Sequence, residues 1–162
     1  MSREFDPLDS VVISVGQIES GEAHNIIPER AHLWGTARAF DTAVRDRIQQ
    51  LMESTVPDIC RAFRGTGNVN YWRNYPQSIN DPNFSAAVTE RASIFFGEDM
   101  AHILERPLLA GEDFAFYSLE APSCFMLLGT GGEYGLHHPK YDVPEDLLYL
   151  ASAWEAFLAL TL

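Results

Sequence analysis

The sequence predicts an α+β fold in two structural units, because two strand patterns and a long helical pattern are followed by a segment in which helix and strand alternate. The first unit reads as strand, strand, helix and strand, the order of a small antiparallel sheet covered by one helix. The order changes between Tyr75 and Asp81. We therefore expect one unit over residues 1–78 and a second over residues 79–162.

Two strands are expected to open the first unit. Residues 11–19 begin with an apolar run and then alternate, which predicts a half-buried strand. Residues 31–40 alternate throughout, so small and apolar side chains should lie on one face of a second strand and larger ones on the other. The first face would carry Ala31, Leu33, Gly35, Ala37 and Ala39, and the second His32, Trp34, Thr36, Arg38 and Phe40. The second face has the composition of a binding surface.

A helix and an aromatic strand complete the first unit. Asp41 can cap a helix whose apolar residues recur at helical spacing as far as Phe63, and Pro57 should bend this helix or remove one hydrogen bond. Gly65-Thr66-Gly67 then turns the chain into an aromatic strand over residues 68–75.

The second unit is expected to begin and end with helices. Asn80-Asp81-Pro82 is a cap followed by proline at the first helical position, and Gly97 should end this helix. A short helix should follow Phe114, and residues 123–129 predict a buried strand. A last helix, opened by Pro144, would bury Leu147, Leu150, Ala151, Trp154, Phe157 and Leu158.

The composition of the chain argues against several classes of protein. No apolar run approaches the roughly 20 residues of a membrane helix, and residues 1–6 lack the features of a signal peptide, so we expect a cytoplasmic protein with no membrane partner. Cys60 and Cys124 offer neither a disulfide framework nor a zinc knuckle, and we expect both to be reduced and buried. The net charge of −12 opposes binding to nucleic acid.

Three local motifs contain residue types suited to binding or catalysis. They are residues 23–28 (Ala-His-Asn-Ile-Ile-Pro) with Arg38 beyond them, residues 111–114 (Gly-Glu-Asp-Phe), and residues 136–142 (Leu-His-His-Pro-Lys-Tyr-Asp). Each also has an ordinary structural explanation. Asn25 can satisfy its own turn, an arginine on a strand usually faces solvent, and the acidic pair suits the start of a helix. From the residues alone, both kinds of explanation stay open.

Together and in this order, the motifs resemble the hippurate-hydrolase and indoleacetyl-amino-acid-hydrolase group of amidohydrolases, which belongs with aminoacylase and carboxypeptidase G among the two-metal peptidases. The similarity runs from residues 2–7, through Gly35-Thr36-Ala37-Arg38 and Asn80-Asp81-Pro82, to the last two motifs. It implies an incomplete ferredoxin-like lid or dimerisation domain over residues 1–78. The C-terminal α/β portion of a metallohydrolase catalytic domain would follow over residues 79–162.

The resemblance also implies an activity and a substrate class. Members of the group hydrolyse the amide bond of N-acyl amino acids or related amides with water activated by two divalent ions, often zinc or manganese. Asn25 and Arg38, with the neighbouring His24, would bind the substrate carboxylate or the polarised carbonyl oxygen. The chemistry suits these residues, since a guanidinium binds a carboxylate bidentately and an amide can donate to an oxygen anion.

By the same resemblance, His137 would be the last metal ligand, although a loop histidine beside proline is the plainer alternative. Glu112 and Asp113 would either support the metal site or simply cap a helix. Asp142 would either orient its neighbouring ligand or cap the last helix.

The family's other metal ligands, its catalytic glutamate and the first strand and helix of its lid have no counterpart in these 162 residues. We therefore expect a fragment that binds no metal tightly and does not hydrolyse an amide alone. Lid domains of this family pair edge to edge, so the resemblance implies a homodimer. The alternative, from another class, is a non-catalytic module for homo-oligomerisation or protein binding.

Overall fold

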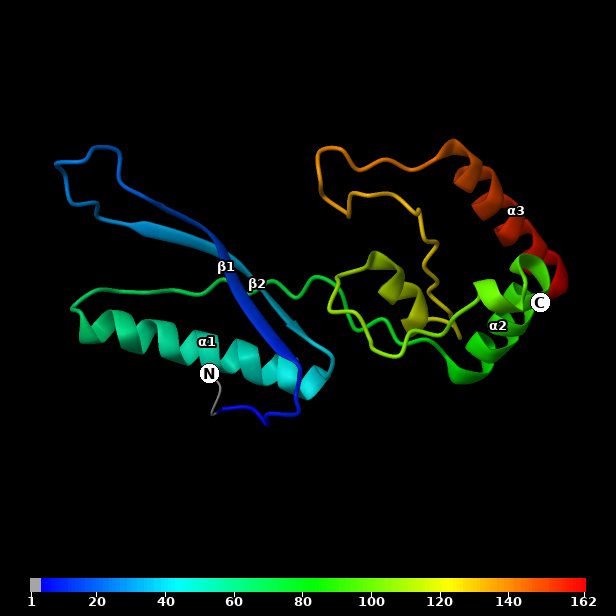
Figure 1. Ribbon diagram of the computed structural model, residues 1–162. Helices are drawn as coiled ribbons and strands as arrows, with labels where there is room; N and C mark the ends of the chain where they lie inside the picture. Colours follow the sequence, from blue (N-terminus) through cyan, green and yellow to red (C-terminus); the bar gives the residue numbers. More distant parts are fainter. Residues whose placement is uncertain (1–3) are drawn as a thin grey trace. The chain divides into compact units, whose positions relative to one another are not determined.

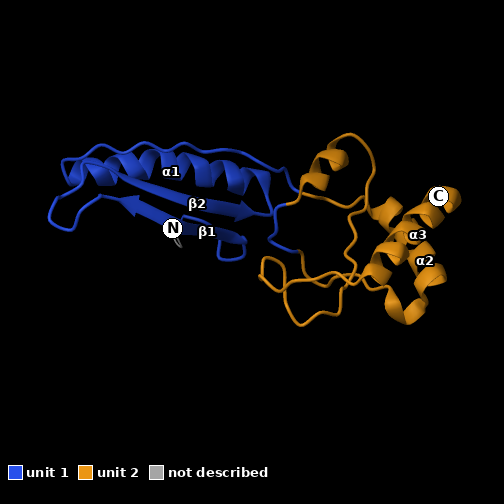
Figure 2. Cartoon of the chain, turned by 90° about the horizontal axis from the view of Figure 1, so that it is seen from above, with its two compact units in different colours: residues 1–77, 108–111 blue, residues 78–107, 112–162 orange. Residues whose placement is uncertain are grey.

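The computed structural model describes residues 4–162 as an α+β chain of two compact units (Figures 1 and 2). Unit 1 comprises the described residues up to Gln77 together with Leu108–Gly111, and unit 2 comprises Ser78–Pro107 and Glu112–Leu162. The elements are, in chain order, β1 (Val11–Ser20), β2 (Ala31–Ala39), α1 (Thr42–Ala62), α2 (Pro82–Phe96), the 3₁₀ helices η1 (Glu98–Met100) and η2 (Asp113–Leu119), and α3 (Glu145–Thr161).

Strands β1 and β2 form an antiparallel hairpin, as predicted from their alternation. The register pairs Val11 with Ala39 and Ile18 with Leu33, and a bulge at Gly16 interrupts it. Because one extra residue in β1 reverses the alternation, Ile18 lies on the same face as Val15. The two-faced arrangement predicted for β2 is confirmed, with the small and apolar residues on one side.

Close approach of the two strands requires glycine at one position of β2. A Cβ atom built on Gly35 would collide with the carbonyl oxygen of Ser14 on β1. At Gly16, in contrast, nothing lies within 4 Å of such an atom. Gly35 therefore sets the spacing of the hairpin, whereas Gly16 only accompanies the bulge.

Helix α1 covers one end of the hairpin face that carries the small residues (Figure 1). Asp41 caps the helix as predicted, because its Oδ1 accepts from the N–H groups of Ala43 (2.7 Å) and Val44 (3.0 Å). Pro57 lies inside α1, which continues to Ala62. Ile48 is completely buried, and Val11, Ile13, Ala37 and Ala39 of the strands are half-buried. Apolar packing of α1 on the hairpin thus forms the core of unit 1.

The chain beyond α1 returns along the helix in the opposite direction (Figures 1 and 2). Arg73 donates to Gln49 (2.7 Å) and forms an ion pair with Asp46 (2.6 Å), while Arg45 donates to the carbonyl of Tyr75 (2.8 Å). Exposure alternates over residues 67–72, as in a strand. The predicted strand over residues 68–75 is nevertheless wrong, because no strand lies beside this segment in the described chain and its backbone forms no ladder.

Unit 2 is organised around the packing of α2 against α3. Its buried core consists of Val88 and Ala92 on α2 and Trp154 on α3. Phe95 and Phe96 contact the Trp154 ring, with centroids 5.5 and 5.1 Å away. Both helices occupy the residues that the apolar spacing predicted, so local patterns were sufficient to locate them.

The side chain of Asn80 links the start of α2 to the segment around Phe125, which follows η2. The side chain of Asn80 accepts from the N–H of Phe125 (2.8 Å) and donates to its carbonyl (3.1 Å). The next residue, Asp81, donates its own N–H to the carbonyl of Ser123 (2.9 Å) and caps α2 through Phe84 N–H (2.8 Å). We call Asn80 with its two bonds to Phe125 the asparagine clamp. Its side chain makes the two hydrogen bonds with the backbone of Phe125 that a neighbouring strand would otherwise make.

Beyond the clamp, residues 123–129 do not form the buried strand that was predicted. Met126, Leu127 and Leu128 are exposed, and the segment has no hydrogen-bonded strand beside it within residues 4–162. The α/β alternation expected for residues 79–162 is therefore wrong for the part of unit 2 that the structure describes, which contains helices but no strand.

Two smaller features complete the description. Cys60 and Cys124 are free, as expected, but they are half-buried and not buried. Among the described residues, no helix is both long and apolar enough to cross a membrane.

Candidate substrate and metal residues

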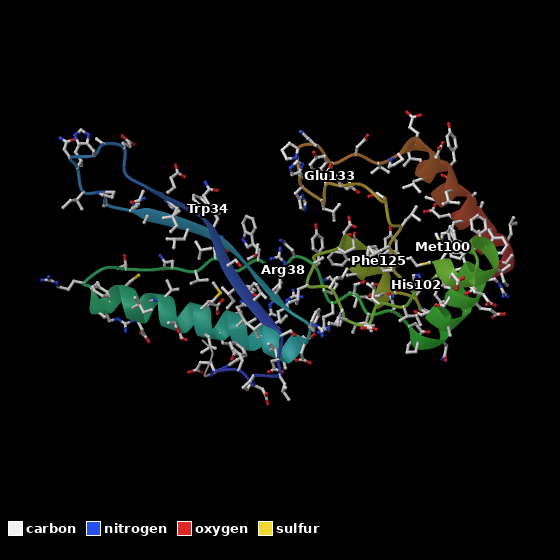
Figure 3. All side chains as sticks on the ribbon, in the orientation of Figure 1. Trp34, Arg38, Met100, His102, Phe125 and Glu133 are labelled. Atoms are coloured by element: carbon white, nitrogen blue, oxygen red, sulfur yellow. The ribbon has the colours of Figure 1, made fainter. Side chains whose placement is uncertain are left out.

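Arg38 lies on the face of β2 that α1 does not cover (Figure 3). Its Nη1 donates to Thr36 Oγ1 at 2.9 Å, and the two residues lie two positions apart on the same face of the strand. The guanidinium is exposed. One of its nitrogens is therefore oriented by Thr36, and the remaining N–H groups are available to an anionic ligand.

Aromatic rings continue the same face of β2. Trp34 is 47% exposed, and its ring stacks on that of His32 with centroids 5.8 Å apart. Figure 3 shows Trp34 and Arg38 projecting from β2. The face combines a cation with flat apolar rings, which suits a ligand that has a carboxylate and an apolar group.

His24 and Asn25 lie in the connection between β1 and β2, where both are exposed. A turn hydrogen bond from the N–H of Ile26 to the carbonyl of Ala23 (3.3 Å) shapes this connection. β2 begins only at Ala31, and Arg38 lies seven residues further on. At ~3.3 Å per residue, the part of β2 between Ala31 and Arg38 is roughly 23 Å long. One copy of the chain thus holds Asn25 and Arg38 at opposite ends of the hairpin.

The acidic pair of unit 2 begins the 3₁₀ helix η2. Glu112 is its N-cap, and its carboxylate accepts from the N–H of Phe114 at 3.4 Å. Asp113 is the acidic residue of the first turn. The capping explanation left open by the sequence is confirmed for Glu112.

His137 lies in a turn before α3 and has a left-handed backbone, with φ of 68°. Its side chain is exposed. Asp142 follows the turn and accepts from the N–H of Val143 (2.9 Å). Helix α3 has Pro144 at its N-cap position and no side-chain cap, so the capping alternative for Asp142 is wrong. Its carboxylate holds the backbone between the turn and the helix.

The sequence-predicted residues are divided between the two units. His24, Asn25 and Arg38 belong to unit 1, whereas Glu112, Asp113, His137 and Asp142 belong to unit 2. The sequence named Thr36 and Asn80 but did not predict their contacts, which are the hydrogen bond from Arg38 to Thr36 and the two bonds between Asn80 and Phe125. The alternation of β2 had already placed Thr36 and Arg38 on one face, which was the available signal for that pair.

An α+β chain with these motifs points to one class of hydrolase. Residues 4–160 match the peptidase family M20/M25/M40, and the chain belongs to this family. The membership agrees with the resemblance to metal-dependent amidohydrolases that the motifs indicated.

Particular relatives show the range of activities in the family. The chain is 37% identical to an N-acetyldiaminopimelate deacetylase of Bacillus subtilis over 153 residues, which cover 93% of the chain and 40% of that enzyme. It is 33% identical to an N-acetyl-L-cysteine deacetylase of the same organism, covering 94% of the chain and 36% of the enzyme. A thermostable carboxypeptidase of Saccharolobus solfataricus is also 33% identical, and the match covers 98% of the chain and 41% of that enzyme.

A solved structure supports the same assignment. The YXEP protein of Bacillus subtilis, described as a dinuclear metal-binding peptidase of the M20 family, matches with a TM-score of 0.73 and 28% identity. The match covers 92% of this chain and 41% of that one. The chain therefore spans about two fifths of the length of the relatives it matches.

The described residues do not by themselves fit a metal centre of this kind. Nowhere in residues 4–162 do three or more His, Cys, Asp or Glu side chains come close enough together to hold a metal ion. A zinc or manganese site needs several protein ligands in one place.

Proposed function

We propose that this chain supplies substrate-binding residues and one metal ligand to a metal-dependent amidohydrolase that hydrolyses N-acyl amino acids or related amides with metal-activated water. The observation that carries the proposal is the family match over residues 4–160. The names of the relatives support the substrate class, because deacetylases of N-acetylated amino acids and carboxypeptidases all cleave an amide bond next to a carboxylate-bearing group.

Arg38 is the group we assign to the substrate carboxylate. It lies on the open face of the hairpin, and the hydrogen bond to Thr36 fixes part of its guanidinium before a ligand arrives. A planar fork of N–H donors matches a carboxylate in geometry and charge. The bond to Thr36 reduces the side-chain entropy that binding would otherwise cost.

Asn25 and Arg38 would act on one substrate only if they came from different copies of the chain. The length of β2 separates them within one copy, so a second hairpin must bring its Asn25, with the adjacent His24, to the Arg38 of the first. The proposed active form is therefore a homodimer.

Exposed apolar residues on the hairpin support this pairing. Val15, Ile18 and Leu33 share one face of the hairpin beyond the part covered by α1, and they are 56%, 68% and 59% exposed. Contiguous apolar side chains of this kind mark contact surfaces. The same observation favours the second candidate function, a non-catalytic oligomerisation module, which would use this surface without any chemistry.

We assign His137 as one metal ligand and propose that the 162 residues alone neither bind a metal tightly nor hydrolyse an amide. Glu112, Asp113 and Asp142 would contribute by fixing the backbone near the ligand, as their hydrogen bonds to Phe114 and Val143 suggest for two of them. The remaining ligands and the group that moves the proton of the activated water would lie in the part of the relatives that this chain does not span.

A chimera tests the proposal. Residues 4–162 replace the matching segment of the N-acetyldiaminopimelate deacetylase relative, and release of amino acid from a panel of N-acyl amino acids is measured with and without Zn²⁺ or Mn²⁺. We expect metal-dependent hydrolysis. Arg38→Ala should lower kcat/KM by about 10- to 100-fold, the loss expected when a charged hydrogen bond of about 1.5–3 kcal/mol disappears.

The matched control is Arg30→Ala, which removes another exposed arginine of the same hairpin and should leave kcat/KM unchanged. Arg38→Lys keeps the charge but not the fork, so it should recover only part of the activity. A folded, metal-loaded chimera without hydrolytic activity would favour the non-catalytic module.

Sedimentation velocity of the 162-residue chain at micromolar concentration tests the homodimer separately. Leu33→Lys places a charge on the apolar face and should dissociate the dimer, whereas Gln50→Lys places a charge at an exposed position of α1, outside the hairpin, and should not. A monomer for the unmodified chain would contradict the pairing.

A further inference from the structure

Trp34 presents a large aromatic ring on the open face of the hairpin, the face that also carries Arg38. The residue is 47% exposed, and its ring stacks on that of His32, with centroids 5.8 Å apart and planes inclined by 29°. The contact with His32 restricts the orientation of the indole. About half of the residue nevertheless remains open, and an aromatic surface of this size gains free energy when a ligand covers it.

The guanidinium of Arg38 is turned along β2 toward Trp34. Its Nη1 donates to Thr36 Oγ1 at 2.9 Å, and Thr36 lies between Arg38 and Trp34 on the same face of the strand. Figure 3 shows Trp34 and Arg38 projecting from β2. Two residues of strand span ~6.6 Å, so the guanidinium at Thr36 lies roughly 7 Å along the strand from Trp34.

An acidic residue lies on the same face beyond the aromatic pair. The register places Glu19 of β1 directly opposite His32, and opposite residues of an antiparallel pair share a face. Glu19 is exposed. The open face therefore carries a positive charge at Arg38 and a negative charge at Glu19, with the indole of Trp34 between them. A ligand with one carboxylate suits the Arg38 end, whereas a second carboxylate near Trp34 would be repelled by Glu19.

A substrate carboxylate bound by Arg38 brings a second substituent of the substrate toward Trp34. In an N-acyl amino acid, the carbon that bears the carboxylate also bears the amide nitrogen and the amino-acid side chain. The proposed function directs the amide toward metal-activated water, so the side chain is the substituent left for the hairpin face. An aromatic ring begins three bonds from the carboxylate carbon and lies roughly 4–6 Å from it, at ~1.5 Å per bond. The methyl group of alanine is only two bonds away and does not reach as far.

We propose that Trp34 is a specificity-determining residue, which stacks on the side chain of the released amino acid and makes N-acyl derivatives of aromatic amino acids the preferred substrates. The inference rests on the proposed function, since it takes Arg38 to bind the substrate carboxylate. Stacking of two rings favours an aromatic side chain over a methyl group, and the charge of Glu19 disfavours an acidic one. His32 contributes by holding the indole in place.

Selectivity of the chimera tests the proposal, as the ratio of kcat/KM for N-acetylphenylalanine to kcat/KM for N-acetylalanine. Trp34→Ala should lower this ratio by about 2- to 13-fold, the change that corresponds to the loss of one aromatic pair. Trp34→Phe keeps a ring and should keep most of the ratio. The matched control, Trp72→Ala, removes an exposed tryptophan of unit 1 outside the hairpin and should leave the ratio unchanged. Partial unfolding lowers both rates and does not change their ratio.

The contact with the ligand is measured separately on the 162-residue chain, by the NMR signal of the Trp34 indole N–H. N-acetylphenylalanine should shift this signal in a saturable way, N-acetylalanine should shift it less, and the signal of Trp72 should stay in place. Equal effects of the two compounds on Trp34, or no effect of either, overturn the inference.

The kinetic outcomes separate this inference from the proposed function. If the chimera hydrolyses both substrates and Trp34→Ala leaves their ratio unchanged, the role of Trp34 is overturned and the proposed function stands. The same holds if Trp34→Ala and Trp72→Ala lower the ratio equally. A folded, metal-loaded chimera that hydrolyses no N-acyl amino acid overturns the proposed function and this inference with it.

Discussion

Replacing Asn80 by alanine removes both hydrogen bonds of the asparagine clamp. In the native chain the Asn80 side chain binds the N–H and the carbonyl of Phe125, at 2.8 and 3.1 Å. A typical hydrogen bond contributes about 0.5–1.5 kcal/mol net, so the pair should contribute about 1–3 kcal/mol. Unit 2 should lose this amount of free energy of unfolding, which corresponds to a Tm decrease of about 4–24 °C in a domain of its size.

The assay can be made specific for unit 2. Trp154 is buried in the core of unit 2, whereas Trp34 and Trp72 belong to unit 1 and are exposed. In a background with the two exposed tryptophans changed to phenylalanine, urea unfolding followed by fluorescence reports on Trp154 alone. The free energy difference between Asn80→Ala and the background is the measured quantity.

Two further variants make the result interpretable. Asn83→Ala changes an exposed asparagine on α2, three residues from Asn80. Its free energy of unfolding should stay within about 0.5 kcal/mol of that of the background. Asn80→Asp can still accept from the N–H of Phe125 but cannot donate to its carbonyl, so it should lose at least one bond. If Asn80→Ala unfolds at the same urea concentration as Asn83→Ala, the clamp does not stabilise unit 2.

Two glycine substitutions test the backbone geometry. Gly35→Ala should destabilise the hairpin by more than about 2 kcal/mol, because the new Cβ collides with the Ser14 carbonyl, and circular dichroism should show a loss of strand signal. Gly16→Ala should leave the stability nearly unchanged, because the space around Gly16 is open. Equal effects of the two substitutions would contradict the register. His137→Gly should be more stable than His137→Ala by about 1 kcal/mol in thermal unfolding, since glycine adopts a left-handed backbone without cost. At His102, which has no positive φ, the order should be reversed, and the same order at both positions would argue against strain at His137.

Sequence patterns located the helices because helix signals are local. Asp41 and Asp81 accept from backbone N–H groups within three residues, and the apolar spacing of α2 and α3 needs no knowledge of the rest of the chain. The hairpin was predictable for a similar reason, since the alternation of β2 is matched by a neighbouring strand close in sequence. The face that carries Arg38 followed directly from that alternation.

The two wrong strands have a common physical cause. Residues 67–72 alternate in exposure and residues 123–129 are mostly apolar, so both have the sequence or burial pattern of strands. A strand also needs a partner at hydrogen-bonding distance, and that partner is not encoded in the segment itself. In the described chain, α1 side chains and the Asn80 clamp take the place of neighbouring strands.

The roles of the candidate residues came from the resemblance to a known family and not from residue types or spacing, which left the ordinary structural explanations open. The resemblance implied roles for Asn25, Arg38 and His137, whereas the distance along β2 between the first two appeared only with the hairpin register. The left-handed backbone of His137 and the stacking of His138 on Tyr134 were likewise not predicted, because no sequence motif specifies a backbone angle or a ring stack.

Metal binding by the 162-residue chain, alone and within the chimera, tests most directly whether this chain supplies one ligand to a larger metal site. Equilibrium dialysis against Zn²⁺ and Mn²⁺ should find no stoichiometric binding to the chain alone, and tight binding to the chimera that weakens when His137 is replaced by alanine. Stoichiometric, tight metal binding by the chain alone would contradict the account.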